Sequence, residues 1–153
     1  MNLEYKIIEN DNFDKIGLKK FILNVNDNFP IPITDKVDID EFLDKIQKNG
    51  VVCCVYDGKK VVSGAFFYAN DFVEKVGFLT LFATLSNYRR YGLGSNLIDM
   101  MVDYCVKLGF KKIQLYTHVS NDNAINFYLK KGFYFIDCDR NNDVKLEKNI
   151  VLN

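Results

Sequence analysis

Residues that can bind an anion gather in the middle of this 153-residue chain. A hydrophobic stretch, Thr80 to Leu85, leads into a loop that holds Arg89, Arg90, Gly92 and Gly94, and an amphipathic stretch follows. Glycines let backbone N–H groups approach a ligand, the start of a helix adds the positive end of its dipole, and arginines add charge. The loop lacks the Lys-Ser/Thr ending of a P-loop and the three-glycine dinucleotide fingerprint. These residues predict an anion site, with a plain strand-to-helix turn as the alternative.

A second group of residues follows after one predicted helix and one predicted strand. It consists of Asn121, Ala124, Phe127, Tyr128 and Gly132-Phe133. Joined to Arg89-x-x-Gly92-x-Gly94, this order resembles the GNAT superfamily of acetyl-CoA-dependent N-acetyltransferases. The resemblance runs from Tyr5 to Leu152, and its motifs are specific for the fold and the cofactor but not for the substrate.

The resemblance implies roles for three sets of residues. In that family the glycine loop binds the CoA pyrophosphate through backbone amides, which places this role on Arg89, Arg90, Tyr91, Gly92, Leu93, Gly94 and Ser95. The strand before the loop pairs with the pantetheine arm, which implicates Phe82, Ala83 and Thr84. Further contacts with the cofactor are expected from Asn121, Ala124 and Phe127. Tyr128 matches the tyrosine that protonates the departing thiolate, although it can also simply pack beside Phe127.

The residue types agree with direct transfer of an acetyl group. Attack of an amine on a thioester needs a neutral nucleophile, stabilisation of the oxyanion of a tetrahedral intermediate, and a proton for the sulfur. Two strands that splay apart, expected at 82–84 and 115–117, expose backbone N–H groups for the oxyanion. A phenol suits the thiolate because their free pKa values lie within roughly two units. The four cysteines form no evident pair with the single histidine, so a cysteine nucleophile is not expected.

The general base stays open at the level of the sequence. His118 lies just past the strand expected beside the acetyl group, and its ordinary pKa near 6.5 suits a base. It alternates with Thr117 and can therefore face away from the cleft. Asp71 and Glu74, in the hairpin before the cofactor strand, are weaker candidates, and Tyr116 is weaker still. A chain of water molecules without a dedicated base is the remaining alternative.

Composition excludes several other classes of protein. Hydrophobic residues make up 48% and charged residues 26%, and 20 basic residues balance 20 acidic ones. No basic excess favours nucleic acid, so no nucleic-acid partner is expected. No signal peptide or spanning segment is evident, and the cysteine spacing matches no metal site. We therefore expect one cytoplasmic domain over residues 1–153, without metal or membrane partner.

The coarse pattern predicts an α+β (α/β) protein. Pro30 and Pro32 break the first helical pattern, and Asp38, followed by Glu41, marks the start of the second helix. Strands are expected at 3–8, 51–56, 60–69, 75–85, 113–117, 133–137 and 144–152, and helices at 13–25, 38–50, 97–108 and 120–129. With the resemblance, this gives a GNAT-like three-layer fold. Its mixed, mostly antiparallel sheet has about seven strands and is flanked by about four helices.

The acceptor is the least determined part of the prediction. Residues 26–37 and the helix that follows are expected to line its cleft. Residues 29–49 resemble members of the family that act on small molecules in surface-glycan pathways, so we expect a small primary amine related to amino sugars. The alternatives are a protein N-terminus or lysine as acceptor, and a non-catalytic acyl-CoA-binding module. A monomer and a homodimer are both compatible with the family.

Overall fold

A computed structural model describes residues 1–138 and 141–151 of the chain. Its strands join in one sheet with the order β1-β2-β3-β4-β5-β7-β6. Their bounds are β1 Leu3–Ile8, β2 Val51–Asp57, β3 Lys60–Asp71, β4 Val76–Thr84, β5 Lys112–His118, β6 Tyr134–Cys138 and β7 Asp143–Asn149. All neighbours are antiparallel except β4 and β5, which are parallel. The mixed, mostly antiparallel sheet is confirmed; the predicted strand end at Leu152 lies outside the described residues.

In the described part of the chain, four α-helices connect and cover the strands. They are α1 Lys15–Val25, α2 Ile39–Asn49, α3 Leu93–Lys107 and α4 Asp122–Lys130, with short 3₁₀ turns η1 Asn10–Asn12, η2 Asn26–Asn28, η3 Ile33–Asp35 and η4 Ser86–Tyr91. The predicted start of α2 is confirmed, because the Asp38 carboxylate accepts a hydrogen bond of 3.0 Å from the Glu41 N–H. No helix in the described part of the chain is long and apolar enough to cross a membrane.

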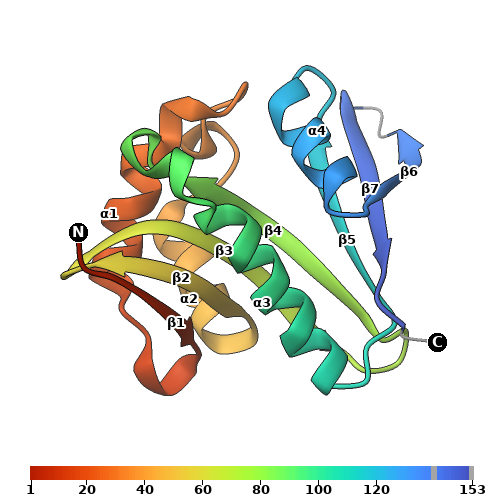
Figure 1. The fold of residues 1–153 in the computed structure, drawn as a ribbon, viewed down its shortest axis with the longest axis horizontal. Helices are drawn as coiled ribbons and strands as arrows, with labels where there is room; N and C mark the ends of the chain where they lie inside the picture. The colour runs from red at the N-terminus through yellow and green to blue at the C-terminus, as the bar shows by residue number, and fades with distance from the viewer. Residues whose placement is uncertain (139–140, 152–153) are drawn as a thin grey trace.

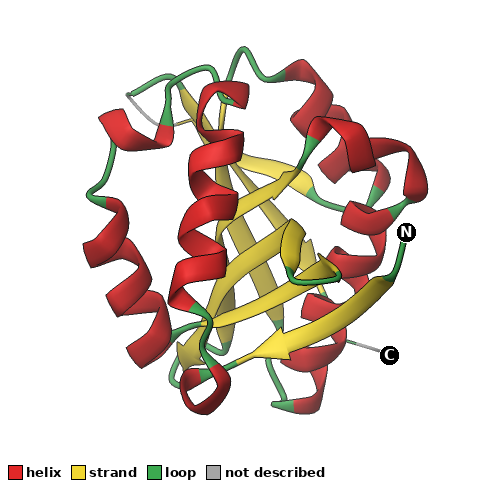
Figure 2. Ribbon diagram, turned by 90° about the vertical axis from the view of Figure 1, so that its left-hand side faces the viewer, coloured by secondary structure: helices red, strands yellow, loops and turns green. Residues whose placement is uncertain are grey.

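The helices form layers on both faces of the sheet. The long α3 lies on one face beside α4, whereas α1 and α2 cover the other face (Figures 1 and 2). Neighbouring residues of β3 show why. Phe67 meets the ring of Tyr104 on α3 at 5.5 Å, and Phe66 stacks on Phe21 of α1 at 6.3 Å. Alternate side chains of a strand point to opposite faces, so β3 anchors both layers.

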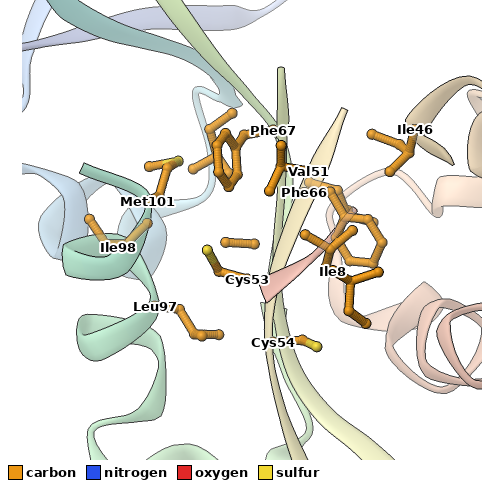
Figure 3. Close-up of a cluster of buried hydrophobic side chains, with 14 of the residues drawn as sticks. Ile8, Ile46, Val51, Cys53, Cys54, Phe66, Phe67, Leu97, Ile98 and Met101 are labelled. Atoms are coloured by element: carbon orange, nitrogen blue, oxygen red, sulfur yellow. The ribbon is translucent and has the colours of Figure 1, made fainter. Parts of the chain in front are cut away.

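The core on the two faces includes three of the four cysteines, Cys53, Cys54 and Cys105. Figure 3 labels Cys53 and Cys54. Cys53 points toward Leu97, Ile98 and Met101, and Cys54 points to the opposite side of the sheet. Burial raises the pKa of the Cys53, Cys54 and Cys105 thiols to about 12 in each case. These three thiols are core residues that stay protonated near neutral pH.

The sheet opens between β4 and β5. Their pairing runs from Val76 opposite Lys112 to Leu79 opposite Leu115 and then stops, while each strand continues beside its other neighbour. In Figure 1 the two strands diverge toward the end where α4 lies. A β-bulge marks the point of separation, since Phe66 and Phe67 of β3 face Leu81 and Leu79, and Thr80 is an extra residue. The predicted splay is confirmed.

Candidate functional site

A cavity of about 630 Å³ occupies the opening between the two strands. One end is lined by η4 and the first turns of α3 and α4. The other end is lined by the segment 28–37 and by Phe42 of α2. The ends therefore belong to opposite helical layers, and the cavity joins the two faces of the sheet at the splay. Seven positions of the expected segment 26–37 line this cavity, together with Phe42 of α2, while positions 26, 27, 32, 34 and 35 lie outside the lining. That this end binds the acceptor stays a prediction.

The start of α3 supplies backbone donors at one end of this cavity. The other three α-helices each begin with a side-chain cap, from Asp14, Asp38 and Asn121. Within the described chain α3 begins at Gly92 without such a cap. The first N–H groups of a helix have no partner inside it and, with the helix dipole, they favour an anion. Gly92 makes this start possible because its φ of 68° is a left-handed conformation that side chains disfavour.

Phe82 and Gly94 form the floor of the cavity next to that helix start. A Cβ on Gly94 would stand 2.8 Å from the Phe82 ring, too close for any side chain without movement. The same ring stacks on Phe127 at 5.3 Å and meets Tyr128 at 6.0 Å. An aromatic cluster therefore links β4 to α4 across the opening, and Gly94 lets α3 approach it.

Tyr128 projects its hydroxyl toward the cavity from this cluster. Its side chain is 6% exposed, and burial raises the pKa of the phenol well above its ordinary value. Among the described residues, no fully enclosed side-chain nitrogen or oxygen lacks a hydrogen-bond partner, and the Tyr128 hydroxyl makes no bond to the protein. That oxygen therefore opens into the cavity that Tyr128 lines. The group is a protonated acid available to a ligand.

The loop before α3 is held in place by hydrogen bonds from both sides. The Tyr88 hydroxyl donates to the Asp57 carboxylate at 2.6 Å, and the Arg89 Nε donates to the Thr84 carbonyl at 3.3 Å. On the α4 side, the Lys131 ammonium donates to the Ser95 hydroxyl at 3.0 Å and to the Asp99 carboxylate at 2.6 Å. These bonds fix the loop and the first turn of α3 between β2 and the end of α4.

His118 and Asn121 line the cavity at the end of β5. The Asn121 side chain accepts a hydrogen bond from the Ala124 N–H at 3.4 Å, which makes it the cap of α4. The His118 Nδ1 accepts the Ser120 N–H at 3.1 Å and lies 2.7 Å from the Ser120 hydroxyl. This nitrogen therefore carries no proton in the neutral ring, and Nε2 holds it. The general-base role of His118 stays a prediction, and this bonding counts against it.

Twelve of the residues predicted for the site line the cavity. They are Phe82, Ala83, Thr84, Arg89, Gly92, Gly94, Ser95, His118, Asn121, Ala124, Phe127 and Tyr128. The Leu93 side chain is buried in the core with 2% exposure, so its contact through the backbone N–H stays a prediction, and Arg90 and the half-exposed Tyr91 lie outside the lining. Leu93 repeats at the helical spacing of Leu97 and Met101, a pattern that predicts a core position. Asp71 and Glu74 also lie outside it, near the paired end of β4.

Sequence reasoning gave no role to several residues that line the cavity, among them Leu79, Thr80 and Asn123. Thr80 lies at the bulge, and bulges leave little signal in a short strand. Lys36 falls within the segment predicted for the acceptor cleft, but its isolated position there gives no motif.

Comparison with known proteins places this arrangement in a family. The sequence model described as the acetyltransferase (GNAT) family matches residues 20–133. The chain belongs to the GNAT acetyltransferase family. N-alpha-acetyltransferase 50 of Danio rerio is 30% identical to this GNAT chain over 99 residues, which cover 64% of the chain and 52% of that protein. The probable N-acetyltransferase san of Drosophila melanogaster is 30% identical over 113 residues, covering 71% of the chain and 58% of that protein.

The chain thus spans little more than half the length of these two relatives. A solved structure extends the likeness to the whole fold. The PaiA N-acetyltransferase from Thermoplasma acidophilum, in complex with coenzyme A, superposes with a TM-score of 0.78 at 16% identity. The superposition covers 97% of this GNAT chain and 99% of that protein. The predicted GNAT-like three-layer fold is confirmed.

Proposed function

We propose that this protein transfers an acetyl group from acetyl-CoA to a primary amine. The observation that carries the proposal is the cavity at the splay of β4 and β5, with the uncapped start of α3 at one end and the Tyr128 hydroxyl opening into it. Membership of the GNAT family supports the same activity. The CoA complex of the T. acidophilum protein supports acetyl-CoA as the donor.

The residues at the α3 end fit the phosphates of CoA. Gly92 leaves open space around the position of its missing Cβ, so an anion can approach the backbone there. The free N–H groups of the first helical turn and the Arg89 guanidinium bind the pyrophosphate. The backbone of Phe82, Ala83 and Thr84 at the edge of β4 is released from β5 and pairs with the pantetheine arm. Asn121, Ala124 and Phe127 form the facing wall.

The same opening serves the chemical step. When bound, acetyl-CoA supplies a thioester that is open to attack by an amine. Backbone N–H groups near the bulge at Thr80 have no partner from β5 and stabilise negative charge on the carbonyl oxygen. Tyr128 gives its proton to the leaving sulfur, a role for which its raised pKa keeps it protonated at neutral pH. The three buried cysteines take no part, because their raised pKa keeps the thiols protonated.

The acceptor is a primary amine, and three classes of acceptor are candidates. A small molecule related to amino sugars follows from the resemblance of residues 29–49. A protein α-amino group is favoured by the name of one relative, N-alpha-acetyltransferase 50. Both acceptors enter from the end of the cavity lined by the segment 28–37, and a lysine side chain is a third candidate.

The test is a transfer assay with purified protein. Acetyl-CoA is incubated with amino sugars, short peptides and lysine derivatives, while free thiol and acetylated product are measured together. The proposal predicts equal amounts of thiol and amide with at least one acceptor class. Tight binding of acetyl-CoA without thiol release for any acceptor would make the protein a non-catalytic acyl-CoA-binding module.

A further inference from the structure

The acceptor half of the cavity is walled mainly by apolar side chains. The segment 28–37 and α2 contribute Phe29, Ile31, Ile33, Val37 and Phe42, and the splayed strands contribute Leu81 and Leu115. Leu115 is 1% exposed, and Ile33 and Leu81 are also buried. Ile31 and Val37 are partly exposed at the rim. An acceptor that reaches the reaction centre therefore passes between hydrocarbon walls.

The charged side chain that the segment 28–37 contributes to this space is basic. It is Lys36, whereas Arg89 of η4 lines the opposite end of the cavity, and no carboxylate lies in the lining that the described residues form. The acidic residues near this segment either bind other groups of the protein or lie outside the cavity lining. Asp38 caps α2, Asp40 pairs with Lys19 at 3.0 Å, and Asp35 is exposed beside Lys36.

The apolar walls and Lys36 disfavour the binding of a protonated amine in this half of the cavity. Moving an ammonium from water into apolar surroundings costs free energy, and a neighbouring lysine adds repulsion between like charges. A neutral amine loses far less on the same path. The fraction of acceptor that is uncharged in solution therefore controls how much of it can react.

We propose that this cavity takes its acceptor as the uncharged amine and so selects weakly basic amines that carry an apolar group next to the nitrogen. The inference rests on the proposed acetyl transfer and names its substrate class. α-Amino compounds with aliphatic side chains fit this description. Alkylamines and lysine side chains are too basic, and amino sugars lack the apolar group.

The group transfer balances with this form of the acceptor. The lone pair of the amine nitrogen forms the bond to the acetyl carbon, and the carbon–sulfur bond breaks with its electron pair on sulfur. Tyr128 gives its proton to that sulfur. The proton released from the nitrogen returns to the phenol through water, so acetyl-CoA and amine become free CoA thiol and amide.

Two acceptors of matched shape test the basicity of the amine. Leucinamide has an α-amino group with a pKa of about 8, whereas isopentylamine has the same branched chain and a pKa near that of lysine, about 10.4. If only neutral amine reacts, the ratio of kcat/KM for leucinamide over isopentylamine narrows by about tenfold between pH 7 and pH 9. An enzyme that binds the ammonium instead gives near parity at pH 7, with leucinamide falling behind at pH 9. That result would overturn the inference.

Serinamide tests the apolar requirement, since it keeps an α-amino group and replaces the branched chain with a hydroxymethyl group. We expect leucinamide to react about tenfold faster at limiting concentration, because its side chain leaves water. Equal rates with serinamide or with glucosamine would contradict an apolar subsite. Absence of thiol release with every amine would remove the proposed acetyl transfer itself, an outcome distinct from loss of selectivity.

A matched pair of variants tests whether the absence of a carboxylate from the cavity lining causes the selectivity. Ile31→Glu places a carboxylate in the lining at a partly exposed position where folding tolerates it, and Ile31→Gln has the same size without charge. The proposal predicts that Ile31→Glu raises the relative kcat/KM of isopentylamine at pH 7 by several-fold and that Ile31→Gln does not. Identical selectivity in the two variants would contradict the electrostatic origin.

Discussion

The Phe82 ring lies 2.8 Å from the place where a Cβ atom on Gly94 would stand. The need for glycine at this position thus comes from the neighbouring strand, in addition to any demand of the proposed phosphate contact. The ring also joins Phe127 and Tyr128, so the start of α3, the edge of β4 and the proposed acid are mechanically connected. A change at Gly94 is expected to disturb all three.

Gly94→Val is predicted to weaken CoA binding while the fold survives. The valine side chain displaces the Phe82 ring and moves the first turn of α3 relative to β4. Calorimetric titration with CoA measures the effect, and circular dichroism checks the fold. Phe82→Leu in the Gly94→Val background makes room and is expected to restore part of the affinity. Unchanged CoA affinity in folded Gly94→Val protein would contradict the placement of the pyrophosphate.

Tyr88→Phe is predicted to raise KM for acetyl-CoA by about fivefold, the usual effect of one lost hydrogen bond. The Tyr88 hydroxyl fixes the loop by its bond to Asp57, and Asp57→Asn is the matched variant. This bond lowers the pKa of Asp57, whose carboxylate therefore stays charged as pH falls to its ordinary range near 3.8. The hydrogen bond between Tyr88 and Asp57 therefore keeps its protonation state between pH 5 and pH 8, and it should cause no change in CoA affinity over that range. An unchanged KM in both variants would show that the hydrogen bond between Tyr88 and Asp57 does not position the loop.

Alanine replacements of Cys53, Cys54, Cys105 and Cys138, made one at a time, are predicted to leave turnover largely intact in each variant that folds. Three of these thiols are buried with a pKa of about 12, which leaves almost no thiolate at neutral pH. Steady-state kinetics measures the outcome. An acetyl-cysteine that forms and decays fast enough to support transfer, detected by mass spectrometry, would overturn direct attack.

The sequence was sufficient for the parts of the fold that depend on local chemistry. Asp38 and Asn121 are caps because short polar side chains bond the N–H groups of a first turn, a rule that acts within four residues. The family resemblance supplied the splay of the sheet. Contacts between distant residues carry no such local signal. The hydrogen bond between Tyr88 and Asp57 joins residues that are 31 positions apart in the sequence, and the bulge at Thr80 depends on the partner strand. Leu93 combines the two kinds of signal, because its side chain follows the helical core pattern while its backbone N–H belongs to the first turn of α3.

The pH dependence of the chemical step gives a further prediction. Burial raises the pKa of Tyr128 above its ordinary value near 10, so the phenol stays protonated as pH rises to that value. The single-turnover rate should therefore show no alkaline loss between pH 8 and pH 10. The contribution of the protonated Tyr128 to the free energy of unfolding is fully present below pH 10. It is lost only as pH rises through the higher pKa that Tyr128 has in the folded protein. A fall in rate with a midpoint near pH 8, in protein that remains folded, would exclude Tyr128 as the acid.

Tyr128→Phe tests the site most directly, since it keeps the ring and its contacts with Phe82 and Phe127 and removes only the hydroxyl. The measurement is the single-turnover rate of acetyl transfer, which isolates the chemical step from product release. General acid catalysis contributes about 100-fold to 10,000-fold, so we predict a loss in that range. CoA affinity and melting temperature should change little because the hydroxyl has no hydrogen-bond partner among the described residues. A folded Tyr128→Phe enzyme with a near-normal single-turnover rate would contradict the proposed mechanism and leave water as the proton donor.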